Sequence, residues 1–119
     1  MNYKRVDRIN ELILEEISDI LLKEIKDPRI GFVTITGVET SVDLSYAKVS
    51  VSIIGEQEKR ESGIEGLKSA SGFIRLLLKK RMSLRRIPDL EFVYDSSIEY
   101  GDRINKILHK LKDEEKWEE

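Results

Sequence analysis

The segment KSASGFIRLLLKKRMSLRRIP, residues 68–88, combines an apolar side and a basic side in one helical pattern. It holds seven Lys and Arg residues and no Asp or Glu, although the formal net charge of the chain is -2. On a helical wheel at about 100° per residue, the apolar residues share one side: Phe73, Ile74, Leu77 and Leu84. A basic stripe occupies the other side: Lys68, Arg75, Lys79 and Arg86. The pattern predicts a helix with a buried back and a basic front.

Ala70-Ser71-Gly72 interrupts this pattern near its start. A glycine inside a helix costs about 1 kcal/mol relative to alanine, which indicates a packing or functional reason for it. We therefore expect two helices, 56–70 and 73–82, that meet in a bend at this kink, where another backbone or a phosphate chain can come close. The free amides at the start of the second helix would favour a phosphate beside Arg75.

The flanking segments change period along the chain. Residues 4–26 place one apolar face on a first helix, at Val6, Ile9, Ile13, Ile17, Ile20 and Leu21, and Asp27-Pro28 ends it. Residues 32–38 and 45–54 alternate apolar and polar side chains, which predicts a pair of strands. A third strand follows Pro88 at residues 90–94. Ser96 or Ser97 would cap a last helix with apolar positions at Ile98, Ile104, Ile107, Leu108 and Leu111.

These changes of period predict one α+β domain in the order α-β-β-α-(kink)-α-β-α, covering residues 1–112, followed by a charged, frayed tail at 113–119. With 119 residues, 39% hydrophobic and 37% charged, the chain can bury a core under a charged surface. The absence of cysteine excludes disulfides and thiolate metal sites. No apolar run is long enough for a membrane span or a signal peptide, so we expect a cytoplasmic protein.

A glycine-marked junction between two middle helices is typical of KH-type RNA-binding domains, in which a GXXG loop clamps the nucleic-acid backbone. The sequence contains a literal match, Gly63-Ile64-Glu65-Gly66. Glu65 would repel a phosphate, and two glycines at this spacing occur often by chance. We therefore do not expect this match to be the clamp.

The order of three longer motifs is more specific. DPR after the first helix, ITGVETSVDLSYAKV over the strand pair and IPDLEFVYDSS over the third strand together resemble the ribosome-binding factor A family over nearly the whole chain. This resemblance implies a type II KH-like fold, with a three-stranded sheet, helices packed on one face, and the kink Ala70-Ser71-Gly72 in place of the GXXG loop. It also implies binding to the free small ribosomal subunit during late maturation and processing of its RNA near the 5′-terminal helix, with particular importance in the cold.

An enzyme and a protein adaptor are the alternatives. His109 is the only histidine, the carboxylates are dispersed, and no phosphate-binding loop or metal-ligand spacing occurs, so we expect no catalytic residue, metal, cofactor or small-molecule substrate. An adaptor of KH-like fold without RNA binding could use a sheet face or the acidic side of the first helix, Glu11, Glu15 and Asp19, although solubility is the better explanation for these acids. Such an adaptor would show no salt-sensitive affinity for RNA.

The sequence therefore predicts a monomeric, non-catalytic factor that binds the small ribosomal subunit through its ribosomal RNA. The residues expected to contact phosphate are Lys68, Arg75, Lys79, Lys80, Arg81, Arg85 and Arg86. A secondary basic patch comprises Lys4, Arg5 and Arg8, for which solvation is the simpler explanation. The stripe itself could be an ordinary solvated face, but it lacks the acidic partners that usually interleave with lysines on such a face.

Overall fold

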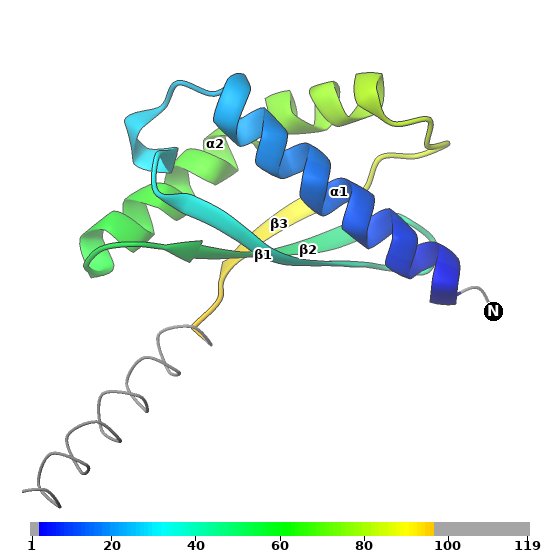
Figure 1. Cartoon of the computed structure of the whole chain (residues 1–119), viewed down its shortest axis with the longest axis horizontal. Coiled ribbons are helices and arrows are strands. Elements are labelled where there is room, and N and C mark those ends of the chain that lie inside the picture. Colours follow the sequence, from blue (N-terminus) through cyan, green and yellow to red (C-terminus); the bar gives the residue numbers. More distant parts are fainter. Residues whose placement is uncertain (1–2, 97–119) are drawn as a thin grey trace, which may run out of the picture.

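The structure is a computed structural model that describes residues 3–96. Its elements, in chain order, are α1 (Tyr3–Lys23), the 3-10 helix η1 (Pro28–Ile30), β1 (Val33–Thr40), β2 (Tyr46–Ile53), α2 (Gln57–Arg81) and β3 (Asp89–Tyr94) (Figure 1). The expected last helix, the tail and the domain boundary at residue 112 lie outside the described residues.

The three strands form one sheet in the order β1-β2-β3. β1 and β2 are antiparallel, and β2 and β3 are parallel. A parallel pair needs a long crossover connection, and α2 supplies it. Both α1 and α2 lie on the same face of the sheet (Figure 1), as expected.

The alternation in β2 explains which face of the sheet is covered. Ala47, Val49, Val51 and Ile53 are buried, whereas the residues between them are partly exposed. β1 follows the same pattern with one irregularity, a register shift between Ile35 and Gly37. Because this bulge adds one residue to β1, Ile35 and Val38 both face the core although they are three positions apart.

The turn between β1 and β2 is built around Asp43. Its Oδ1 accepts hydrogen bonds from Ser41 Oγ at 2.8 Å, Ser45 Oγ at 2.7 Å and the Ser45 backbone N–H at 3.1 Å. Leu44 adopts a left-handed conformation, with φ of 61°. The side chain of Asp43 therefore compensates for an uncommon backbone geometry at a residue other than glycine.

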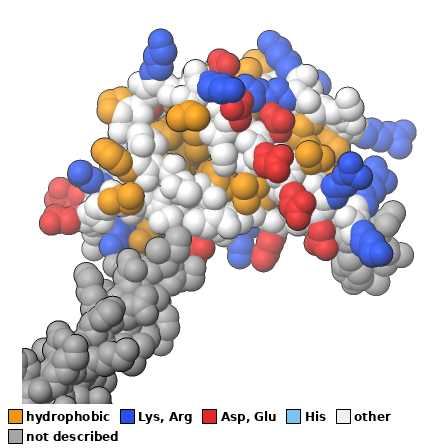
Figure 2. All heavy atoms as spheres, viewed as in Figure 1, with side chains coloured by type: hydrophobic (Ala, Val, Ile, Leu, Met, Phe, Trp, Pro, Cys, Tyr) orange, Lys and Arg blue, Asp and Glu red, His pale blue; other side chains and the backbone are white. Residues whose placement is uncertain are grey.

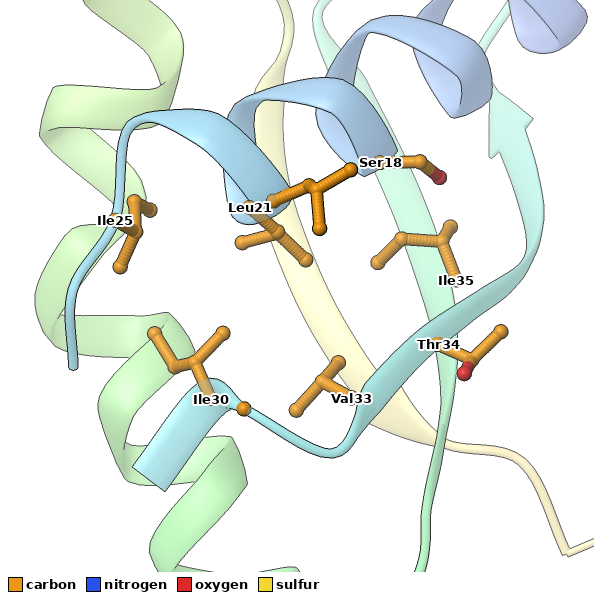
Figure 3. A pocket seen from close by; sticks show the side chains of 9 residues that line it. Ser18, Leu21, Ile25, Ile30, Val33, Thr34 and Ile35 are labelled. Carbon is orange, nitrogen blue, oxygen red and sulfur yellow. The ribbon is translucent and has the colours of Figure 1, made fainter. Parts of the chain in front are cut away.

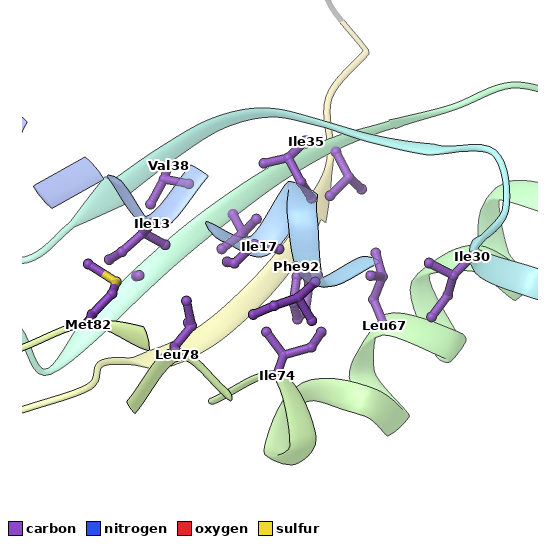
Figure 4. Packing of buried hydrophobic residues seen from close by; sticks show 14 of the residues in the cluster. Ile13, Ile17, Ile30, Ile35, Val38, Leu67, Ile74, Leu78, Met82 and Phe92 are labelled. Atoms are coloured by element: carbon purple, nitrogen blue, oxygen red, sulfur yellow. The ribbon is translucent and has the colours of Figure 1, made fainter. Parts of the chain in front are cut away.

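The core lies between the sheet and the two helices (Figure 4). α1 contributes one apolar stripe, the buried residues Ile9, Ile13, Ile17 and Ile20, as its periodicity predicts. Leu67, Ile74 and Leu78 of α2 are fully buried opposite it, and Phe92 of β3 is 3% exposed. This packing fixes α2 on the sheet, and with it the orientation of every basic residue that α2 carries.

The expectation of two middle helices is wrong, because α2 runs without interruption through Ala70-Ser71-Gly72. Leu67 and Ile74 are both buried, so the core holds the helix on either side of the glycine. Ser71 Oγ donates to the carbonyl of Lys68 at 2.9 Å, a bond that Ser forms within a helix rather than at its end. A Cβ added to Gly72 would meet no atom within 4 Å, so no close backbone approach occurs there.

The close approach occurs at the GXXG match instead. A Cβ on Gly63 would lie 2.8 Å from Ile53 Cδ1 and 3.3 Å from the carbonyl oxygen of Arg29. A Cβ on Gly66 would lie 3.1 Å from Ile30 Cγ1. These two glycines therefore let α2 pack directly against η1, and the match has a packing function.

The DPR motif shapes η1. Asp27 accepts a hydrogen bond from the Arg29 backbone N–H at 2.9 Å and caps the short helix, with Pro28 in its first turn. The guanidinium of Arg29 donates to both oxygens of the same carboxylate. This local cluster positions Ile30 in the core and presents the carbonyl of Arg29 to Gly63 and the side chains of Arg29 and Ile30 to Gly66.

Candidate nucleic-acid interface

Charge is unevenly distributed over the molecule. In Figure 2, Asp and Glu side chains follow α1 across the middle of the view, while Lys and Arg gather at the upper edge and the right-hand end. That end contains the start of α1, the β1–β2 turn and the loop that follows α2 (Figure 1). The predicted phosphate ligands belong to α2 and this loop, and the structure divides them into two groups by their partners.

Arg75 belongs to the first group, whose donors are used within the protein. Its Nε donates to the carbonyl of Pro88 at 3.1 Å, and its Nη2 donates to that of Ile87 at 3.0 Å. Nη2 also lies 3.3 Å from Asp89 Oδ1. Arg75 therefore ties α2 to the segment that enters β3, and its side chain remains 40% exposed.

Arg81 is the second cation of this group. Its Nη1 lies 2.6 Å from Asp19 Oδ2 and 3.2 Å from Glu16 Oε2, and its Nη2 lies 3.7 Å from Glu24 Oε1. The hydrogen bond from Arg81 lowers the pKa of Asp19, and a hydrogen bond from Lys23 adds to this effect. Arg81 therefore joins the end of α2 to the acidic side of α1. Asp19, one of the acids that an adaptor could have used, thus has a structural role.

The second group has no such partner in the part of the chain that the structure describes. Its members are exposed and form no ion pair with any residue between 3 and 96: Lys68, Lys79, Lys80, Arg85 and Arg86. α2 ends at Arg81, where the N–H of Met82 closes the last turn onto Leu78 at 2.8 Å. Leu84, Arg85 and Arg86 therefore lie in the following loop, and the helical wheel was wrong to include Leu84 and Arg86. Lys68 lies about 16 Å along the helix from Lys79.

The structure brings the secondary patch toward this second group. Lys4, Arg5 and Arg8 are exposed on the first turns of α1. Arg5 lines a small hollow with Val42, Asp43 and Leu44 of the β1–β2 turn. Hydrogen bonds from Ser45 and Ser41 lower the pKa of Asp43 to about 2, and the nearby charge of Arg86 adds to this. Arg5 and Arg86 thus both lie near the same turn.

Two apolar residues interrupt the basic surface of α2. Phe73 was expected in the core but is 46% exposed, and Leu76 is 51% exposed. The buried line of α2 runs through Leu67, Ile74 and Leu78, and Phe73 lies about 100° away from Ile74. The helical wheel placed Phe73 on the apolar side because Leu77 and Leu84 were taken as the middle of the buried face. The spacing of Leu67, Ile74 and Leu78 could have located the middle of that face correctly.

One further hollow offers little chemistry. The hollow in Figure 3 lies between the end of α1 and β1, and its lining is apolar or hydroxyl-bearing, without any charged side chain: Ser18, Leu21, Leu22, Ile25, Ile30, Gly31, Val33, Thr34 and Ile35. Between residues 3 and 96, no three His, Asp or Glu side chains come together as ligands for a metal ion. Among the described helices, none combines the length and the apolar character that crossing a membrane requires. His109 lies outside the described residues.

Comparison with known proteins gives a consistent result. The family model described as ribosome-binding factor A matches residues 5–108. The chain is 49% identical over 115 residues to ribosome-binding factor A of Halothermothrix orenii, covering 97% of this chain and 94% of that protein. It is also 49% identical over 111 residues to the protein of the same name from Natranaerobius thermophilus, covering 93% and 85%.

Solved structures show the same likeness. The crystal structure of ribosome-binding factor A from Thermus thermophilus has a TM-score of 0.68 at 25% identity and covers 75% of this chain and 93% of that one. The solution structure of a putative ribosome-binding factor A from Thermotoga maritima has a TM-score of 0.70 at 33% identity, covering 82% and 92%. A Thermus thermophilus homology model fitted into a cryo-EM map of a 30S complex has a TM-score of 0.61 at 25% identity, covering 73% and 91%. The predicted KH-like α+β fold is thereby confirmed.

Proposed function

Because the chain belongs to the ribosome-binding factor A family, we propose that it binds the free small ribosomal subunit and assists late maturation and processing of that subunit's RNA near the 5′-terminal helix. The relative fitted into a 30S complex supports the choice of partner. We further propose that the protein acts as a monomer in the cytoplasm, where small subunits assemble, that it needs no cofactor, and that it matters most in the cold.

One observation carries the proposal for RNA. Between Gly66 and Pro88 the chain has no acid, and five of its seven cations there are exposed and unpaired with any described residue. Backbone phosphates are the ligands that such a surface fits, since each bound cation releases counterions from the RNA. Phosphate contacts would supply most of the affinity, and the shape of the folded RNA would supply selectivity.

The mechanism requires no bond to be made or broken by the protein. The exposed cations of α2 and the following loop would bind one arrangement of the RNA on the immature subunit and raise the population of that arrangement. A ligand shifts such an equilibrium only by its preference for one state. Binding should therefore be tighter to immature small subunits than to assembled ribosomes.

Sedimentation tests this directly. The purified protein, mixed with free small subunits, should comigrate with them through a density gradient at low salt, and it should not comigrate with assembled ribosomes. Comigration with both, or with neither, would contradict the proposed partner.

Paired charge reversals test the surface. Lys79→Glu with Lys80→Glu should weaken binding to small-subunit RNA and lower the slope of log affinity against log salt by roughly 0.7 to 0.9 for each phosphate that is no longer bound. The matched control reverses Lys26 and Lys59, which are also exposed but lie at the other end of the molecule. Equal losses of affinity in both pairs would mean that net charge alone governs binding.

A protein adaptor remains the second candidate, on one observation. Phe32 is 60% exposed and Ile54 is 72% exposed beside a hollow that Lys59 also lines. Apolar centres with mixed charge around them are typical of protein interfaces. Binding to the subunit that is independent of salt and undisturbed by the Lys79 and Lys80 reversals would favour the adaptor.

A further inference from the structure

Phe73 and Leu76 expose apolar surface in the middle of the basic half of α2. Phe73 is 46% exposed and Leu76 is 51% exposed, although both belong to a helix whose opposite face is fully buried. At about 100° per residue, Leu76 points almost directly away from Leu67 and Ile74, the centre of the buried face. Phe73 lies about 60° to one side of Leu76, one turn earlier.

The charged residues that follow this apolar pair in sequence, up to Pro88, are all basic. Lys80 lies within about 20° of Phe73 on the wheel and two turns further along, about 10 Å away. Lys79 lies about 60° to the other side of Leu76. Both lysines are exposed, and no acid follows Glu65 until Asp89. An exposed aromatic ring thus lies about two turns along α2 from two cations that form no ion pair with any described residue.

We propose that Phe73 is a stacking platform for an unpaired RNA base, with Leu76 packing beside that base and Lys79 and Lys80 holding the flanking phosphates. This proposal rests on the proposed RNA binding and names the form of RNA that the surface accepts. Stacking on an aromatic ring suits single-stranded segments, loops and bulges, because their bases are free of partners. Complementary charge favours RNA over a protein partner, since Lys79 and Lys80 have no acid among their sequence neighbours on this half of α2.

Phe32 provides the contrast within the same molecule. Its ring is more exposed, at 60%, and Lys59 lies 5.5 Å from the ring centroid. Lys59, however, stands in an acidic stretch of the chain: Glu56, Glu58 and Glu61 are exposed in and just before the first turns of α2. Phe32 is therefore the matched control, an exposed phenylalanine beside a lysine but without a continuous basic surface.

The test measures affinity for an unstructured oligoribonucleotide, for a hairpin with an open loop taken from small-subunit RNA, and for a fully paired duplex. Phe73→Ala should weaken binding to the first two by roughly 5- to 100-fold, the range for loss of one stacked base, and leave duplex binding unchanged. Phe73→Tyr should retain the affinity because its ring still stacks. Phe73→Leu should lose most of it, since leucine keeps the apolar surface without the ring.

The salt dependence separates stacking from charge. Because no phosphate contact is removed, Phe73→Ala should leave the slope of log affinity against log salt at its original value, whereas Lys79→Glu should lower it. Phe32→Ala should change neither the affinity nor the slope. Thermal melts of all variants should remain near that of the unmodified protein, because both rings are exposed.

Three outcomes would overturn the stacking site while the proposed RNA binding stands: full affinity in Phe73→Ala, full affinity in Phe73→Leu, or an equal loss in Phe32→Ala. If Phe73→Ala binds isolated RNA normally but binds intact subunits weakly, the surface around Phe73 contacts a protein of the subunit. That result would also overturn the proposal. If the unmodified protein shows no salt-sensitive affinity for any RNA, the proposed function fails, and the stacking site fails with it.

Discussion

Arg75 and Arg81 show that the role of a charged side chain depends on its neighbours more than on its own chemistry. Both lie in the acid-free segment, and both looked like phosphate ligands in sequence. Arg75 instead holds two carbonyls of the loop before β3, and Arg81 holds three acids of α1 and the residues just after it. These partners are 12 to 65 positions away in the chain, so a local sequence pattern cannot predict them.

Asp43 should make the stability of the β1–β2 turn depend on pH. Hydrogen bonds from Ser45 and Ser41 lower its folded-state pKa to about 2 from an ordinary value of 3.8. A carboxyl with a lowered pKa stabilises the folded state fully above its unfolded value, and this contribution is lost as the pH falls toward the folded value. Asp43→Asn should therefore lower the melting temperature at pH 7, and the difference from the unmodified protein should shrink between about pH 4 and pH 2. A difference that stays constant over this range would show that the charge of Asp43 does not matter.

Gly63 and Gly72 should respond oppositely to a side chain, although both lie within α2. Gly72→Ala should stabilise the protein by about 0.5 to 1 kcal/mol, because the added methyl meets nothing and alanine is the better helix former. Gly63→Val should destabilise it by about 1 to 3 kcal/mol through overpacking against Ile53 and the Arg29 carbonyl. Urea denaturation of the two variants measures both effects. If Gly72→Ala destabilises the protein instead, the result would support the tight bend at Gly72 that the sequence pattern predicted.

Three parts of the continuous helix α2 have different roles. Its first half packs on η1 through Gly63 and Gly66, its middle fills the core through Leu67, Ile74 and Leu78, and its last turns carry the exposed lysines. Because the middle is anchored in the core that the sheet and α1 share, the lysines are held on a rigid support. A binding surface on a rigid element loses less conformational entropy on binding than one on a loop.

The sequence predicted the elements well where one periodicity dominated. The stripe of α1, the alternation of β2 and the position of β3 are all confirmed. The split of α2 was wrong because glycine propensity is a small local term, about 1 kcal/mol, which burial on both sides of Gly72 outweighs. The bulge in β1 was not predicted, since a single extra residue such as Thr36 leaves no periodic signal.

Replacing Arg75 should loosen the connection between α2 and β3. Hydrogen bonds from a charged donor contribute about 1.5 to 3 kcal/mol, and the partial exposure of Arg75 suggests the lower end of that range. Arg75→Gln should lower the free energy of unfolding accordingly, and Arg75→Lys should rescue little of it, because one ammonium group cannot reproduce the fork of a guanidinium. Lys79→Gln, one turn further on, is the control and should stay within about 0.5 kcal/mol.

The RNA affinity of the same variants gives a second measurement. Since the donors of Arg75 are used within the protein, Arg75→Gln should leave the salt slope for small-subunit RNA nearly unchanged. A slope reduced by roughly 0.7 to 0.9 would instead support a direct phosphate contact, as the basic stripe predicted.

The whole molecule separates charge in a way that its net charge of -2 conceals. Acids follow α1 across one face, whereas cations border that face at the end where α1 begins and α2 stops (Figure 2). The sequence could identify the basic segment and a second basic group at the opposite end of the chain. It could not show that the two meet at the β1–β2 turn, because that meeting depends on how α1 and α2 cross the sheet.

This arrangement leads to a prediction about the secondary patch of Lys4, Arg5 and Arg8, which the sequence alone left as a solvated group. Arg5 and Arg86 both lie near the turn around Asp43, so we expect that one RNA backbone following the loop after α2 can also reach the start of α1. Arg5→Glu with Arg8→Glu should therefore lower the salt slope for small-subunit RNA by up to about 1.5, and adding Lys79→Glu with Lys80→Glu should lower it further by a similar amount.

If the Arg5 and Arg8 patch is only a solvated group, the result would differ: the Arg5 and Arg8 reversals would leave the slope unchanged while the Lys79 and Lys80 reversals reduce it. Fluorescence titrations of the three variants between about 50 and 200 mM salt distinguish these results, and thermal melts of the same samples establish that each variant is folded. A slope that falls with the Arg5 and Arg8 pair would extend the interface from α2 across the turn to α1.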